Sequence, residues 1–139
     1  MHPDLDVARQ LVRGSAAIFA HLVSEGPVDG LPPEDREVVR RIGAAYDEAR
    51  HGLTTADHAS LLPDAFLDRF AVVGTPAHCV RRLQELIALG LDRVIVVPGS
   101  RDADPDALAE SNELFATEVL PVLTGGTSAA PGRAEESPA

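Results

Sequence analysis

The sequence has little of several features that mark whole classes of protein. It has a single cysteine, Cys79, which excludes an internal disulfide and fits a reducing compartment. No apolar run approaches the roughly 20 residues that a membrane-spanning helix needs. Met1 is followed by His2, Pro3 and Asp4 rather than by the basic and apolar regions of a signal peptide. We therefore predict a cytoplasmic protein without a membrane partner.

Basic residues are also scarce. The chain has 12 Lys and Arg against 22 Asp and Glu, which gives a net charge of −10. Affinity for nucleic acids depends on clustered basic side chains that displace the counterions of phosphates, so we expect no nucleic-acid partner. What remains is ordinary: 45% hydrophobic and 24% charged residues in 139 residues are typical of one globular domain with a core.

Common chemical motifs are missing too. The sequence contains no Ser-His-Asp order, no P-loop and no G-x-G-x-x-G fingerprint. His51 and His58 are seven residues apart and have one nearby carboxylate, Asp57, which fits metal-ligand spacing poorly. Residues 102–113 place acids at EF-hand positions, but Ala107 stands where that loop requires glycine. We predict no metal site and interpret the acids as a helix start.

Hydrophobic periodicity predicts a mostly helical chain. Apolar residues recur at helical spacing over residues 4–23 and 34–50, with Tyr46 in the apolar stripe of the second helix. Gly and Pro mark the intervening residues as a loop. Two later segments each begin with a capping residue followed by proline, Thr75-Pro76 and Asp104-Pro105. They predict helices that run to Gly90 and to about Leu123.

Two segments look extended. Residues 94–97, Val-Ile-Val-Val, are β-branched without polar alternation and stop at Pro98, which predicts a strand covered on both faces. Residues 70–73 form a shorter stretch of the same kind. We therefore predict a βαβα unit with parallel strands over residues 70–123, after a helical connection over residues 1–69. Residues 124–139 lack large aliphatic side chains and are predicted to be disordered.

A two-stranded parallel sheet is not a domain, so the missing neighbours need an explanation. Either other chains supply them or this chain is the end of something larger. The segment "GTPAHCVRRLQELIALGLDRVIVVP", residues 74–98, resembles the C-terminal signature of the luciferase-like monooxygenase superfamily. The upstream context, including "EDREVVRRIGAAYDEARHG", is more narrowly similar to the methylenetetrahydromethanopterin reductase-like branch. One departure is His78, at a place where the family often has glutamate.

The resemblance covers residues 1–123 and implies an α/β fold. The chain would be the C-terminal portion of a (β/α)8 TIM-type barrel, mostly helical here, with one or two parallel strands and with the first seven barrel strands missing. We expect a fragment, or a frame in which Met1 is an internal start. The implied partner is then the missing half-barrel or a second copy of the chain.

The resemblance also implies a chemistry. The whole enzyme would be an oxidoreductase that transfers hydride between a reduced coenzyme, the deazaflavin coenzyme F420 or FMN, and a small organic substrate. Because the cofactor ring would lie against strands that this chain lacks, we expect no turnover by the chain alone. The alternative is a non-catalytic helical interaction module, or half of a split enzyme, that pairs its strand edge with another chain.

Few residues are candidates for the site itself. Gly99, Ser100 and Arg101 follow the predicted last strand, where TIM-barrel loops often bind phosphate, so they could approach an anionic cofactor group. The alternative is a solvated loop. His51 lies in the segment expected to cover the site and could steer or protonate a substrate, or it could merely close a helix. Cys79 in a first helical turn is better explained as a small semi-buried residue.

Overall fold

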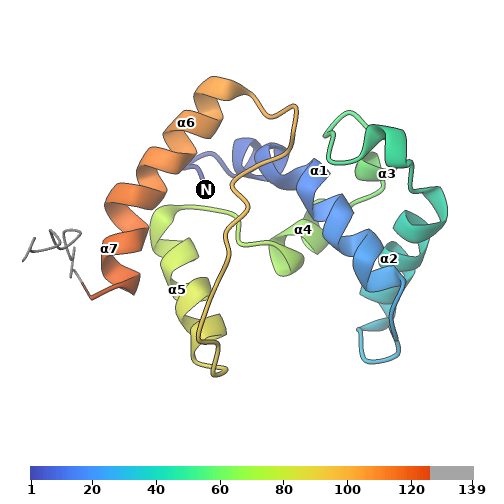
Figure 1. The fold of residues 1–139 in the computed structure, drawn as a ribbon, viewed down its shortest axis with the longest axis horizontal. Coiled ribbons are helices and arrows are strands. Elements are labelled where there is room, and N and C mark those ends of the chain that lie inside the picture. The colour runs from blue at the N-terminus through green and yellow to red at the C-terminus, as the bar shows by residue number, and fades with distance from the viewer. Residues whose placement is uncertain (126–139) are drawn as a thin grey trace, which may run out of the picture.

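The fold is helical in the part of the chain that the computed structural model describes, residues 1–125. Helical residues make up 62% of that part and strands 0%, and its ribbon is an assembly of helices joined by loops (Figure 1). The elements in chain order are α1 (Leu5–Ser24), α2 (Pro33–Ala45), the 3₁₀ turn η1 (Glu48–Arg50), α3 (Asp57–Ser60), α4 (Asp64–Phe70), α5 (Pro76–Ile87), α6 (Pro105–Leu114), the π-helical turn η2 (Phe115–Val119) and α7 (Leu120–Leu123). The disorder predicted beyond Gly125 falls outside the described residues.

The predicted fold class is wrong. Residues 1–125 contain no sheet, so neither a portion of a TIM-type barrel nor a pair of parallel strands is present. The physical reason is that a strand needs a hydrogen-bonded neighbour. Residues 92–98 have no such neighbour, and Phe70, expected to open the other strand, is the last residue of α4.

The predicted helix starts are confirmed at three places. The Asp4 carboxylate accepts hydrogen bonds from the backbone N–H groups of Asp6 and Val7 and caps α1. Thr75 and Asp104 cap α5 and α6 in the same way, each with a proline in the first turn. These devices are local, so they can be identified without knowledge of the tertiary fold.

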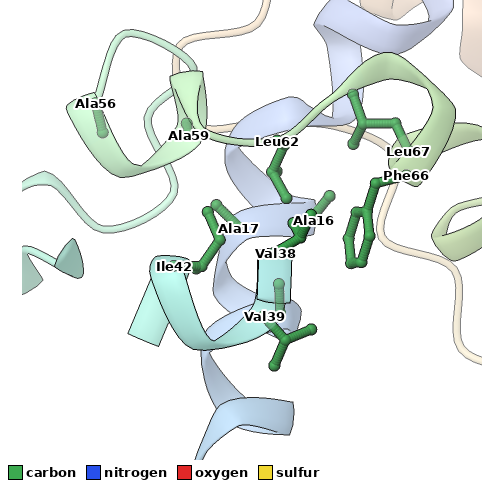
Figure 2. Packing of buried hydrophobic residues seen from close by; sticks show 11 residues of the cluster. Ala16, Ala17, Val38, Val39, Ile42, Ala56, Ala59, Leu62, Phe66 and Leu67 are labelled. Carbon is green, nitrogen blue, oxygen red and sulfur yellow. The ribbon is translucent and has the colours of Figure 1, made fainter. Parts of the chain in front are cut away.

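The main core lies between α1 and the segments that follow it as far as α4. Small residues of α1 let α2 approach closely, and the apolar faces of α2, α3 and α4 close around them (Figure 2). The core residues are Ala16, Ala17, Ala20, Val38, Val39, Ile42, Ala56, Ala59, Leu62, Phe66 and Leu67. Two ion pairs join α1 to α4, because Arg9 pairs with Asp68 and Arg13 pairs with Asp64.

A second group of helices, α5, η2 and α7, lies beside the first and buries Cys79, Leu83 and Val119. Sequence periodicity predicts one helix from residue 105 onward, whereas the structure widens it into the π-helical turn η2. Pro121 lies just beyond that turn. Proline has no N–H and its ring collides with the carbonyl four residues earlier, which accounts for the wider turn.

The chain between α5 and α6 is extended and solitary (Figure 1). None of the backbone groups of residues 92–98 makes a hydrogen bond to another described residue. The side chains of this stretch, which we call the extended segment, are also exposed, with 83% of Ile95 accessible to solvent. In a folded protein, backbone N–H and C=O groups are normally hydrogen-bonded and large apolar side chains are normally buried. A stretch of chain that meets neither condition is rare.

Candidate functional site

The predicted site residues Gly99, Ser100 and Arg101 follow the extended segment, and the first two dock it onto α1. Ser100 is only 5% exposed, and its Oγ accepts hydrogen bonds from the N–H groups of Gly14 (2.9 Å) and Ser15 (3.3 Å). The same hydroxyl donates to the carbonyl oxygen of Leu11 at 3.0 Å. All the hydrogen-bonding positions of this hydroxyl are therefore engaged within the protein.

Gly99 packs where a side chain would not fit. A Cβ at this position would lie 2.9 Å from Cδ1 of Leu108 and 3.2 Å from the carbonyl oxygen of Leu11. Its own carbonyl accepts a 2.6 Å hydrogen bond from Oγ of Ser15. Gly99 and Ser100 thus join the C-terminal end of the extended segment to the middle of α1.

Arg101 meets the other predicted residue, His51. Its backbone N–H donates to the carbonyl oxygen of Gly52 at 2.9 Å, and its guanidinium donates to the carbonyl oxygen of His51 at 2.7 Å. Gly52 has a φ of 74°, and a Cβ there would lie 3.0 Å from Cδ of Arg101. The structure therefore brings the two sequence candidates together, through the backbone of the loop rather than through the imidazole.

Asp102 completes this junction. Its carboxylate accepts hydrogen bonds from the N–H of Thr54 (2.7 Å), the N–H of Thr55 (3.3 Å) and the hydroxyl of Thr55 (3.1 Å). Burial raises the pKa of this carboxyl, but the hydrogen bonds from Thr54 and Thr55 outweigh burial and lower the pKa below its ordinary value. Asp102 is therefore a charged clamp on residues 51–55.

Behind the same loop lies a cluster of aromatic side chains around Tyr46. The ring of His21 stacks on Tyr46 with centroids 3.9 Å apart, and the ring of His58 tilts against Tyr46 at 4.4 Å. Tyr46 therefore contacts both imidazoles. The phenol oxygen is 2.7 Å from Nδ1 of His51. We call Tyr46, His21, His51 and His58 the histidine cluster.

The three histidines of this cluster differ in their polar surroundings. Nε2 of His21 lies 4.0 Å and Nδ1 of His51 lies 3.9 Å from carboxylate oxygens of Glu48. His58 is 1% exposed, and its Nδ1 accepts a 3.3 Å hydrogen bond from the N–H of Asp47. Burial lowers the pKa of His58 and raises the pKa of Tyr46. The nearby negative charge of Glu48 raises the pKa of Tyr46 further.

The remaining sequence candidates lie elsewhere. Cys79 is a free, fully buried thiol 3.6 Å from the carbonyl oxygen of Gly74, and burial raises its pKa. Within residues 1–125 no three His, Cys, Asp or Glu side chains are placed to share a metal ion. None of the helices of that part combines the length and the apolar character needed to cross a bilayer.

A hollow lined by residues of several helices runs along the extended segment. It is a groove of about 540 Å³ between that segment and the helices, and its lining is mostly apolar. Its walls include Phe19 of α1, Phe70 at the end of α4, Leu83 and Leu86 of α5, and Phe115 of η2. The groove and the exposed side chains of the extended segment thus form one continuous apolar region.

No protein-family model, curated protein or solved structure matches the chain. The similarity to luciferase-like enzymes therefore rests on the sequence signature alone. The function has to be inferred from the geometry of the extended segment and of the loop that holds it.

Sequence reasoning missed the histidine cluster. It placed Tyr46 in the apolar stripe of a helix over residues 34–50, whereas α2 ends at Ala45 and Tyr46 has an extended backbone (φ −66°, ψ 130°). His21 and His58 come from α1 and α3, so no sequence spacing connects them. His51 and His58 lie near Tyr46 in the sequence, but His21 does not, so no signal in the sequence could have found the whole cluster.

Proposed function

We propose that the chain acts by association: it presents residues 92–98 as a strand to the sheet edge of another polypeptide. The observation that carries this proposal is that the backbone N–H and C=O groups of the extended segment have no partner in the described chain. Peptide groups in that state pair readily with a second extended chain, which is the usual mode of strand addition.

The side chains support the same conclusion. Val94, Ile95, Val96 and Val97 are each at least 39% exposed, although β-branched residues of this kind normally fill the interior of a sheet. Burying one such side chain fully stabilises a complex by about 2 kcal/mol. A partner strand would therefore gain both backbone hydrogen bonds and apolar contacts, and Pro98 would end the pairing because it has no N–H.

The anchoring of the segment also favours association. Ser100, Arg101 and Asp102 hold its C-terminal end to α1 and to residues 51–55, so the run is already extended before it meets a partner. Preorganisation of this kind reduces the entropy that binding must offset. The partner is a second copy of the chain or a separate polypeptide with an open sheet edge.

The test uses two variants with matched exposure. Ile95→Asp places a charge in the extended segment, whereas Leu89→Asp places one on a side chain that is 79% exposed but outside the segment. Analytical ultracentrifugation of the chain alone, and with the polypeptide encoded directly upstream of its frame, measures association. We expect Ile95→Asp to weaken association at least tenfold and Leu89→Asp to leave it unchanged. The proposal is contradicted if the two variants associate equally well. It is also contradicted if the wild-type chain associates neither with itself nor with the upstream polypeptide.

A second proposal concerns what the assembly does. We propose that the assembled protein is a cytoplasmic luciferase-like oxidoreductase that uses coenzyme F420 or FMN, and that this chain has no turnover alone. Two observations support it: the signature of residues 74–98 and the hydrogen bond that joins Arg101 to His51, the two charged or titratable candidates for the rim of the site. Arg101 would face the anionic part of the cofactor and His51 the substrate.

Cofactor binding tests this second proposal. Fluorescence titration with F420 and with FMN should detect no micromolar binding by the chain alone and clear binding by the mixture with the upstream polypeptide. Arg101→Ala should then weaken binding about tenfold, because one charged hydrogen bond contributes about 1.5 kcal/mol. Micromolar binding by the chain alone, or none by a mixture that does associate, would rule the enzyme interpretation out.

A further inference from the structure

The loop that anchors the extended segment ends at a buried histidine, His58. Residues 46–58 begin at Tyr46 and end at His58, and the two rings are in contact at 4.4 Å. Between them lie His51, Gly52, Thr54 and Thr55, which make the hydrogen bonds to Arg101 and Asp102. The position of His58 therefore affects the loop that contacts Arg101 and Asp102.

His58 has no place for a second proton. Its Nδ1 accepts a hydrogen bond from the N–H of Asp47, so the proton of the neutral ring is on Nε2. Nε2 is buried and has no hydrogen-bond partner among the described residues. A protonated His58 would direct an N–H at the N–H of Asp47 and would bury a charge without an acceptor, which is strongly unfavourable.

We propose that His58 is an acid-sensitive latch: when it takes up a proton, residues 46–58 open, and the junction with Arg101 and Asp102 is lost. Ser100 then remains as the anchor of the extended segment on α1. The consequence for association rests on the function proposed above. A segment that has lost part of its anchorage is less preorganised, so association through residues 92–98 weakens in acid.

The charged groups that act on His58 come from η1 and the residue before it, from α1 and from its own helix, α3. Arg50 from η1 and His21 from α1 disfavour its protonation, whereas Asp47 beside η1 and Asp57 on its own helix favour it, and burial outweighs both. Carboxylate oxygens of Glu48 lie within 4.0 Å of His21 and His51. His58, by contrast, is almost fully buried and its Nε2 has no hydrogen-bond partner among the described residues, so its protonation requires a structural change.

The direction of the pH dependence follows from linkage. Because the folded protein keeps His58 neutral below its ordinary pKa of 6.5, the opened loop binds a proton that the closed loop does not. The closed state is fully favoured above pH 6.5 and loses stability as the pH falls from there towards the lowered pKa. For one proton the opening equilibrium rises by up to about tenfold for each pH unit.

Tyr46 gives a direct probe, since it is the only tyrosine and the chain has no tryptophan. The experiment follows Tyr46 fluorescence and the amide protection factors of Thr54, Thr55 and Arg101 from pH 8 to 5, on the full chain at a concentration where it is monomeric. His58→Asn keeps an acceptor near Nδ1 and cannot be protonated. His78→Asn, on α5, is the matched control because it removes a histidine outside the cluster.

We expect the wild type and His78→Asn to lose protection at all three amides together as the pH falls, with a parallel change in fluorescence, and His58→Asn to stay flat. The same transition in His58→Asn, or constant protection in the wild type, overturns the latch. If His58→Asn fails to fold, NMR titration of His58 in the wild type decides: titration near 6.5 with the loop closed overturns it, and late titration coupled to opening supports it. These measurements need no partner, so the latch can stand even where association fails.

Discussion

The guanidinium of Arg101 donates a 2.7 Å hydrogen bond to the backbone carbonyl of His51, fifty residues earlier in the chain. This contact joins the end of the extended segment to the loop that carries the histidine cluster. It places the two candidate residues of the sequence at one junction, and it makes the geometry of the extended segment depend on a loop that senses protonation.

Gly14 is the point of closest approach between α1 and this loop. A Cβ at residue 14 would lie 2.5 Å from the carbonyl oxygen of Gly52 and 2.7 Å from the carbonyl carbon of Leu53, both of them backbone atoms. We predict that Gly14→Ala destabilises the fold by about 3 kcal/mol, because the loop must move away from α1. Gly30→Ala is the control, since nothing lies within 4 Å of that Cβ. Urea unfolding measures both variants, and similar midpoints would contradict the described packing.

Ser100→Ala removes the hydroxyl that bonds the extended segment to α1. We predict a loss of about 2 kcal/mol, since the buried N–H groups of Gly14 and Ser15 lose an acceptor and the carbonyl of Leu11 loses a donor. Ser60→Ala, which removes an exposed hydroxyl bonded to its own helix, should cost less than about 0.5 kcal/mol. Equal losses of unfolding free energy in the two variants would show that Ser100 is not an anchor.

Asp102 predicts a separate pH dependence in strong acid. Its pKa is lowered in the folded state, so its contribution is fully present above its ordinary value of 3.8 and is lost as the pH falls through the lowered pKa. Asp102→Asn should therefore lower the unfolding free energy at pH 7 by less than about 1 kcal/mol, because the carboxylate is exposed. At pH 3 the same substitution should lower it much less. Asp29→Asn, an exposed acid outside the junction, should change neither value. A difference for Asp102→Asn that persists at pH 3 would contradict this role.

Features that depend on neighbouring residues could be predicted from the sequence, whereas features that depend on distant residues could not. The predicted caps at Thr75 and Asp104 depend only on neighbouring backbone groups, and both are present. The strand at residues 94–97 depends on neighbours that the described chain does not contain, so β-propensity alone leaves it extended but unpaired.

The candidate site divides in the same way. Arg101 could be selected because it follows the predicted last strand, and His51 because the family resemblance places it in the segment that covers the site, yet their contact through a backbone carbonyl could not be predicted. Tyr46 and His58 become neighbours only after α2 ends earlier than its periodicity indicates. The oxidoreductase chemistry implied by the family resemblance stays a prediction, because its cofactor site would lie mainly on elements beyond those described.

The central claim is that residues 92–98 are held extended, unpaired and ready for a partner strand. Amide hydrogen exchange at Val94, Ile95, Val96 and Val97 measures this most directly, in the monomeric chain and in the mixture with the polypeptide encoded upstream. We predict exchange near the rate of an unstructured peptide in the monomer and protection of alternate amides by at least about tenfold in the complex, as expected for one hydrogen-bonded edge of a strand. Strong protection in the monomer, or association that leaves all four amides unprotected, would contradict the account.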